Sequence, residues 1–314
     1  MARDDNFKTD QMVRAAWMYY ISGRNQSDIA AELGLSRPVV QRLIAAAKEE
    51  GIVSVGLHHP ISTCLDYAEM LKTKYQLVEC NIVPTSSSEE TLDNVAFGCF
   101  QLMSKYLKNQ KNQIIGIGSG STLKKALNRI DFESPSNQCV ALISAIGTAG
   151  QCNYYDDVPL MLARKIQSNY YQMPAPRYAT SCKELAAWTN MRVFKEVERM
   201  ADSATVIFVG TGSLSQGTSP IINDGFITTE EANALNQQGA VGEILGRFID
   251  AHGEVVDCDI NGFVTSYDIR TNDCPRIGAA CGEDKRPAIL AALRGGWFSG
   301  LVTDEATARW LLTQ

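Results

Sequence analysis

Short apolar runs alternate with helix-like segments along most of the chain, and this alternation restricts its fold more than any other feature. The apolar runs are 78–83, 113–118, 139–145, 205–210, 263–269, 276–281 and 299–303. Helical patterns are expected at 62–75, 89–108, 121–129, 157–169, 190–200, 229–250, 284–294 and 304–312. Continuous apolar strands separated by helices are typical of a parallel sheet covered on both faces. We therefore predict an α/β fold, with a doubly wound, mainly parallel sheet over residues 61–314.

Composition argues against several classes of protein. The 314 residues carry a net charge of −6, nine cysteines without a C-x-x-C pair, and three histidines. An acidic chain does not coat nucleic acid nonspecifically. Scattered cysteines in apolar runs are typical of reduced, mostly buried thiols, and three histidines do not favour a multi-histidine metal site. No membrane span or signal-peptide core is apparent. We expect a cytoplasmic protein with no cofactor, metal or membrane contact.

The first sixty residues have the pattern of three short helices. The first is expected at 10–22, with its inner face formed by Val13, Ala16, Trp17 and Tyr20. Gly34 permits a tight turn between the second helix and the third, which runs to about residue 50. The run IVSVGL at 52–57 is expected to be a strand of a wing. Two short helices joined by a glycine-containing turn form a helix-turn-helix, so residues 1–60 are predicted to be a DNA-binding domain.

The third predicted helix presents a polar face suited to DNA. Arginine and glutamine make bidentate contacts with guanine and adenine edges, whereas helix N-termini suit phosphates. The predicted partner is double-stranded operator DNA. The alternative is a plain three-helix bundle with a solvated charged face. The candidate DNA-binding residues are Asn25, Gln26, Ser27, Ser36, Arg37, Pro38, Gln41, Arg42 and Lys48.

Three turns rich in glycine, serine and threonine follow predicted strands, at 118–122, 147–150 and 211–213. Ligands bind at the carboxyl ends of parallel strands. Glycine lets backbone N–H groups point at an anion, and hydroxyl groups add donors. The GSGST segment at 118–122 also begins a predicted helix, which suits a phosphate. It matches neither the Walker loop nor the dinucleotide fingerprint, and an ordinary tight turn is the alternative reading of any one loop.

A sugar-sized ligand needs polar groups beyond a phosphate site. Glu243 is expected one turn into a helix, surrounded by small residues, where its carboxylate can accept sugar hydroxyl groups. Lys285 follows a predicted strand and opens a helix, where it can meet a phosphate or a hydroxyl group. Solvated surface positions are the alternative for both residues.

These segments together resemble the SorC family of sugar-binding, DeoR-like transcriptional regulators, over essentially the whole chain. The matching segments are NQSDIAAELGLSRPVVQRLIAAAKEEGIV, GIGSGSTL, YYQMPAPRYA, GAVGEILGRFID and GEDKRPAILAALRGGWFSGLVTDEATARWLL. The resemblance implies a winged helix-turn-helix joined to an effector and oligomerisation domain related to sugar-phosphate isomerases and deaminases. It also implies homotetramers, often dimers of dimers, that control sugar or polyol operons in response to a phosphorylated sugar.

The resemblance also assigns ligand-binding residues. By resemblance, the phosphate loop corresponds to residues 119–122, and the sugar contacts correspond to Gly147, Thr148, Gly150, Glu243 and Lys285. Thr211 and Gly212 are added because they follow the predicted strand at 205–210. Family members often have a Gly-Gly pair, sometimes after a basic residue, where this chain has Ile146-Gly147-Thr148, so an unphosphorylated polyol stays open as the ligand. The candidate ligand-binding residues are Ser119, Gly120, Ser121, Thr122, Gly147, Thr148, Gly150, Thr211, Gly212, Glu243 and Lys285.

Two functions remain to be compared. The first is an effector-controlled regulator without enzymatic activity. The second is a sugar-phosphate isomerase or deaminase with an appended DNA-binding head. Such catalysis needs a positioned acid–base pair. His252 is the only histidine after residue 60, and it lies at the end of a predicted helix, away from every strand-end loop. The regulator is therefore the predicted function.

Overall fold

The computed structural model describes residues 2–53, 61–109, 111–147, 150, 152, 158–214 and 219–314. The chain divides into two compact units, Met1–His59 and Pro60–Gln314. This division lies one residue from the predicted boundary. We call the first unit the head and the second the body, and each is described by itself.

The head is a three-helix unit with its own small core. Its helices are α1 (Ala2–Tyr20), α2 (Gln26–Leu33) and α3 (Arg37–Glu49). At Gly34, which ends α2, the backbone turns into the left-handed conformation, with φ of 66°, and its N–H bonds the Ala30 carbonyl. The predicted turn is therefore confirmed. The buried side chains are those of Met12, Ala15, Ala16, Ile29, Ala30, Val40, Leu43, Ile44 and Ala47.

The inner face of the first helix was predicted wrongly in part. Val13 is 44% exposed and Trp17 is 57% exposed, whereas Ala15 and Ala16 are buried. Small alanine side chains let α1 approach the other two helices closely, and packing selects that face over the larger neighbouring side chains. The predicted wing strand at 52–57 lies mostly outside the described residues.

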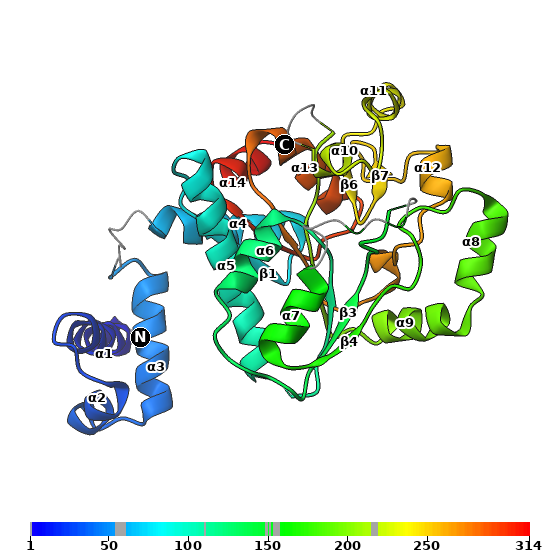
Figure 1. The fold of residues 1–314 in the computed structure, drawn as a ribbon. Coiled ribbons are helices and arrows are strands. Elements are labelled where there is room, and N and C mark those ends of the chain that lie inside the picture. Colours follow the sequence, from blue (N-terminus) through cyan, green and yellow to red (C-terminus); the bar gives the residue numbers. More distant parts are fainter. Residues whose placement is uncertain are drawn as a thin grey trace. The chain divides into compact units, whose positions relative to one another are not determined.

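The body is built on a seven-stranded sheet in which every pair of neighbouring strands is parallel (Figure 1). The strand order is β1-β9-β8-β5-β2-β3-β4. The chain therefore builds outward from β2 to β4, then returns to place β5 on the other side of β2. The strands are β1 (Glu79–Val83), β2 (Ile114–Ile117), β3 (Gln138–Ala141), β4 (Asn169–Tyr171), β5 (Val206–Val209), β8 (Arg276–Ala279) and β9 (Gly300–Asp304).

Helices cover both faces of this sheet, as predicted for a doubly wound fold. Two separate hydrophobic clusters lie on the two faces because the strands are apolar on both sides. One cluster includes α5 (Ser88–Asn109), α6 (Ser121–Asn128) and α7 (Val158–Ile166). The other includes α4 (Ile61–Tyr75), α9 (Arg192–Asp202), α13 (Arg286–Arg294) and α14 (Glu305–Leu312).

The prediction of a single helix at 229–250 is wrong. Only α11 (Thr229–Gln237) is helical, and an antiparallel hairpin of β6 (Gly242–Ile244) and β7 (Arg247–Ile249) follows it. The hairpin has a two-residue turn in which φ is 52° at Leu245 and 79° at Gly246. Positive φ at both positions is the geometry of tight β-hairpin turns, which are usually signalled by Asn-Gly or Asp-Gly. Leucine at the first position hides that signal.

The strand predicted at 263–269 is also wrong. Thr265 donates its N–H to the Arg177 carbonyl, and Tyr267 donates its N–H to the Leu142 carbonyl, so the segment bonds two separate loops instead of one ladder. It follows the short helix α12 (Asp259–Gly262). The prediction missed β4, α10 (Pro220–Asn223) and α8 (Cys182–Thr189).

The cysteines and the lengths of the helices test the expectations drawn from composition. None of the nine cysteines, all of which lie in the described part of the chain, forms a disulfide. Burial raises the pKa of Cys99 and of Cys139 to about 12. Three of the nine thiols are buried, four are half-buried, and Cys152 and Cys182 are exposed, so the prediction of mostly buried thiols is wrong. Among the residues that the structure describes, no helix is long and apolar enough to cross a membrane.

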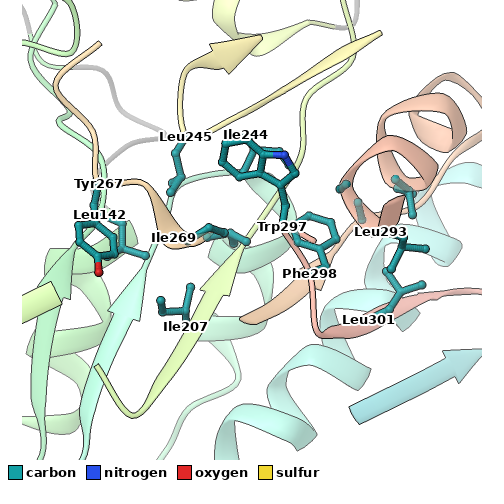
Figure 2. Close-up of a cluster of buried hydrophobic side chains, with 14 of the residues drawn as sticks. Leu142, Ile207, Ile244, Leu245, Tyr267, Ile269, Leu293, Trp297, Phe298 and Leu301 are labelled. Atoms are coloured by element: carbon teal, nitrogen blue, oxygen red, sulfur yellow. The ribbon is translucent and has the colours of Figure 1, made fainter. Parts of the chain in front are cut away.

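Trp297 is the largest side chain that is fully buried in the body. Figure 2 shows it in one cluster of buried side chains with Ile244 of the hairpin and Phe298. Its indole N–H donates a 2.7 Å hydrogen bond to the Gly253 carbonyl, so the polar edge of the ring is satisfied inside the core. Trp297 therefore ties the hairpin to the last strands of the sheet.

We predict that Trp297→Ala lowers the free energy of unfolding of the body by about 3–5 kcal/mol, because it removes a large apolar side chain and leaves the Gly253 carbonyl unpaired. Chemical denaturation followed by circular dichroism measures this change. Val193→Ala on α9, where the side chain is 53% exposed, serves as the control and is expected to change stability by less than about 0.5 kcal/mol. Equal effects of the two substitutions would contradict the packing role of Trp297.

Candidate functional site

A cavity of about 270 Å³ lies at the carboxyl ends of the central strands of the body. The loops after β2 and β5 both line it, and strand order reverses between these two strands. Crevices at such reversals are the usual ligand sites of open α/β sheets. Eight of the predicted ligand-binding residues line this cavity: Ser119, Gly120, Ser121, Thr122, Thr211, Gly212, Glu243 and Lys285.

The start of α6 forms one wall of the cavity. Gly120 precedes the helix with φ of 126°, and neither a side-chain cap nor an acidic residue occupies the first turn. The N–H groups of a first helical turn have no partner within the helix and carry partial positive charge. Ser121 is half-buried and Thr122 is 4% exposed, so this positive end is shielded from bulk water. The geometry suits an anionic group, as predicted for 118–122.

Glu243 reaches the cavity from an element that the sequence did not predict. It lies on β6, and its backbone N–H and carbonyl form two 3.0 Å hydrogen bonds with Gly212. The Gly246 N–H donates to its Oε2 at 2.8 Å, which holds the carboxylate in place. A Cβ atom on residue 212 would lie 2.5 Å from the Glu243 Oε1, so a larger residue there would displace the carboxylate. The hairpin and the loop after β5 thus form one wall.

Lys285 lines the same cavity from the segment after β8. It ends a short 3-10 turn, Glu283–Lys285, directly before α13, and its side chain is half-buried. Burial raises the pKa of the neighbouring Cys281 to about 11, which disfavours the thiolate form that a nucleophile needs. Lys285 and Glu243 therefore bring an ammonium group and a carboxylate to the same cavity.

The loop at 147–150 contributes less than predicted. Gly147 and Gly150 are not among the described residues that line the cavity. The Gly150 N–H donates a hydrogen bond to the Gly147 carbonyl in a local turn. Thr148 lies outside the described residues. The neighbouring Ile146 carbonyl accepts a 2.8 Å hydrogen bond from the Arg177 N–H. Arg177, on the chain after β4, lines the cavity.

Sequence reasoning missed nine of the residues that line the cavity, and five of them lie on segments that were not predicted: Arg177, Ile221, Asn223, Asp224 and Leu245. They come from the chain after β4, from α10 and its end, and from the hairpin turn, none of which was predicted. One signal was available for Arg177. It is the only charged residue in the segment YYQMPAPRYA, and a lone charge in such a run indicates a buried or binding role.

Arg177 is only 4% exposed. Its Nε and Nη2 donate to the Ser144 carbonyl at 3.1 and 3.0 Å, and the guanidinium carbon lies 3.5 Å from the centre of the Phe226 ring. The next residue, Tyr178, donates its hydroxyl to the Gly246 carbonyl at 2.6 Å. Burial raises the pKa of Tyr178 far above its ordinary value, so this donor stays protonated. These contacts join the chain after β4 to the hairpin.

The head presents the predicted polar face on α3. Arg37, Gln41 and Lys48 are exposed and lie within about 40° of one another around the helix, whereas Arg42 lies about 100° from Gln41. The first three residues therefore form one stripe and Arg42 flanks it. Ser36 precedes α3 without a side-chain cap hydrogen bond, and Pro38 lies in the first turn.

The start of α2 is organised differently. The side-chain oxygen of Asn25 accepts hydrogen bonds from the N–H groups of Ser27 and Asp28, both at 3.0 Å. Asn25 therefore caps the helix, and its side-chain amide also donates to the Asp28 carboxylate at 2.6 Å. The side chain of Gln26 is half-buried, and that of Ser27 is exposed. Ser27 is the better placed of these residues to meet a phosphate.

Each of the two units matches a known protein family. Residues 14–62 match a helix-turn-helix domain family, and residues 59–313 match the family described as "Putative sugar-binding domain". The erythritol catabolism regulatory protein EryD of Brucella abortus is 31% identical over 306 residues, which cover 96% of each chain. The transcriptional regulator LsrR of Escherichia coli K12 is 32% identical over 307 residues, which cover 96% of this chain and 94% of LsrR.

A solved structure shows the same architecture. The full-length sorbitol operon regulator SorC from Klebsiella pneumoniae superposes with a TM-score of 0.72 at 27% identity, covering 97% of this chain and 99% of SorC. The match extends over head and body, as do the matches to EryD and LsrR. The chain therefore belongs to the SorC family of transcriptional regulators, in which a DNA-binding helix-turn-helix is joined to a sugar-binding domain.

Proposed function

We propose that this regulator controls an operon for sugar or polyol catabolism, and that a sugar, a polyol or its phosphate bound in the body cavity changes its affinity for operator DNA. The observation that carries this proposal is the cavity at the strand-order reversal, where anion-binding and hydroxyl-binding groups meet. The names of two relatives, which refer to erythritol catabolism and to a sorbitol operon, support a small polyhydroxylated effector.

Within the cavity, a phosphate of the effector would bind the N–H groups and hydroxyl groups at the start of α6, at residues 119–122. Thr211 and Gly212 form the adjacent backbone wall. The Glu243 carboxylate would accept sugar hydroxyl groups because its position is fixed by the Gly246 N–H. Lys285 would donate to a hydroxyl or a phosphate oxygen. Gly147, Thr148 and Gly150 would contribute only if their loop approaches a bound ligand.

We further propose a cytoplasmic homotetramer without enzymatic activity. Relatives that match nearly the whole chain are named as regulators, which favours regulation over catalysis. No histidine is among the described residues that line the cavity, and an isomerase or deaminase would need a positioned acid–base pair. Operators recognised by helix-turn-helix proteins have two-fold symmetry, so at least a dimer is required.

The test of the proposed function is fluorescence anisotropy of the full chain on DNA from upstream of its own gene. Titrations are run alone and with a panel of sugar phosphates, sugars and polyols. We expect tight, salt-sensitive binding that one class of compound changes. Absence of sequence-specific binding in every condition would contradict the regulator, and turnover of ring-opened sugar phosphates would instead support the enzyme.

At the DNA, we predict that Arg37→Ala weakens specific binding by about 1–3 kcal/mol, because Arg37 lies on the exposed stripe of α3 and contacts a base edge. The measurement is the same anisotropy titration on operator and on scrambled DNA. Arg192→Ala on the exposed surface of α9 removes the same charge from the body and is the matched control. An unchanged operator affinity for Arg37→Ala would exclude Arg37 from base recognition.

At the effector site, we predict that Ser121→Asp abolishes the ligand response. A carboxylate in the first turn of α6 would occupy the anion site and repel a phosphate there. The matched control is Asn128→Asp, which adds the same charge at the exposed far end of the same helix. The readout is the ligand-induced change in operator affinity. A full response in Ser121→Asp would refute the phosphate assignment of residues 119–122.

A further inference from the structure

The body has a second cavity, of about 370 Å³, which is lined by α8, α9 and the segment 264–271. We call it the α8 cavity. In the described part of the chain it shares no lining residue with the cavity at the strand ends. The turn of the β6–β7 hairpin lies between the two, because Leu245 lines the strand-end cavity and Arg247 lines the α8 cavity. The α8 cavity is therefore a separate candidate site.

Arg247 is a half-buried arginine of the α8 cavity, and it forms no ion pair with the described residues. Its Nη1 donates to the Ser266 hydroxyl at 2.7 Å and to the Tyr267 carbonyl at 3.0 Å, and its Nη2 donates to the Ser266 carbonyl. Burial lowers the pKa of Arg247, and the charge of Asp268 opposes this shift only in part. Asp268 forms its ion pair with Arg270, at 2.8 Å. The Nε–H and one Nη2–H of Arg247 are therefore available to a ligand, and a carboxylate can accept from both.

Two carboxylates lie at the mouth of the same cavity. Glu198 and Asp202 line the cavity, are exposed and stand one turn apart on α9, so they lie on one face of that helix. The Tyr267 hydroxyl donates to Asp202 at 2.7 Å, while the backbone carbonyl of Tyr267 accepts from Arg247. Arg247 and Asp202 therefore contact opposite ends of one tyrosine, whose length separates the positive charge from the negative one.

The walls between these charges are apolar. Met173 is 1% exposed and Phe194 is 4% exposed, and Leu185 of α8 lines the cavity with them. None of the eight residues of α8 is fully buried, although so short a helix depends on packing for its stability. Methylene groups of a ligand in this cavity would pack against Leu185 and gain free energy from burial.

We propose that the α8 cavity is a second binding site, for a small amino carboxylate whose carboxylate and ammonium groups lie at opposite ends of a carbon chain. The carboxylate binds Arg247, the ammonium group binds Glu198 and Asp202, and the carbon chain lies on the apolar walls. A phosphate or a dicarboxylate fits less well, because the two carboxylates at the mouth repel additional negative charge. This site does not depend on the proposed function of the strand-end cavity.

The experiment is isothermal titration calorimetry of the full chain with 4-aminobutanoate, 5-aminopentanoate and 6-aminohexanoate, whose two charges lie increasingly far apart. Three further probes test each feature: hexanoate lacks the ammonium group, hexylamine lacks the carboxylate, and leucine carries both groups on one carbon atom. We expect at least one of the three amino carboxylates to bind with an affinity about 10-fold or more above that of the other probes.

Arg247→Met tests the position of the bound carboxylate. It removes the charge with little change in volume and is expected to weaken binding of the amino carboxylate by about 10- to 100-fold. Arg192→Met on the exposed surface of α9 is the matched control and is expected to bind like the wild type.

A double variant tests the mouth, and it decides the question if Arg247→Met does not show the wild-type circular dichroism spectrum. Glu198→Gln combined with Asp202→Asn removes both mouth charges at exposed positions and is expected to weaken binding of the amino carboxylate by about 10-fold, without weakening that of hexanoate. Glu196→Gln combined with Glu230→Gln is the matched control, because it removes the same charge at exposed positions outside the cavity.

The outcomes separate this inference from the proposed function. A wild type that binds none of the three amino carboxylates, or that binds hexanoate or hexylamine equally well, would overturn the α8 cavity as their site. Unchanged affinity in a folded Arg247→Met, or in the double variant where Arg247→Met does not fold, would overturn it as well. None of these results bears on the response of operator binding to sugars and polyols, which tests the strand-end cavity.

Discussion

The reversal of strand order between β2 and β5 is the constraint on which the cavity at the strand ends of the body depends. Because all seven strands run parallel, their carboxyl ends lie along one edge, and the chains leaving β2 and β5 lead to different sides of the sheet. The loops at 118–122 and 210–213 therefore diverge and leave a crevice. The β6–β7 hairpin forms a wall of that crevice through the two backbone hydrogen bonds between Gly212 and Glu243. Position and lining of the cavity thus follow from topology.

Local signals explain what the sequence could predict. Caps, a left-handed glycine and apolar spacing act within a few residues, so the three head helices and the turn at Gly34 were foreseeable. Buried parallel strands are continuous apolar runs, and six of the seven strands of the sheet were found this way. Serine and threonine at strand ends gave the loops at 119–122 and 211–213. The inner face of α1 was harder, because two neighbouring faces are apolar and tertiary packing chooses between them.

The parts that were missed depend on contacts between distant segments. Leu245 adopts positive φ without the usual turn sequence, and its side chain packs where a Cβ on Gly118 would come within 2.9 Å. β4 has three residues, too few for an apolar pattern. Arg177 reaches the cavity only because β4 lies beside β3 and places it over Ser144. The loops that line the cavity could therefore be predicted from local composition. The other walls could not, because they depend on pairing between segments that are distant in the sequence.

The chain is divided into a head and a body, so an effector bound in the body can change DNA binding by the head only through the conformation of the whole protein. A ligand shifts the head only if its affinity differs between the operator-bound and free states of the whole protein. This coupling is reciprocal: an effector that lowers operator affinity tenfold must itself bind tenfold more weakly to the operator-bound protein. Residues of the cavity can thus act on DNA binding without touching it. Under the proposed function, the lining of the cavity selects the compounds that exert this coupling, and the exposed stripe on α3 selects the operator on which they act.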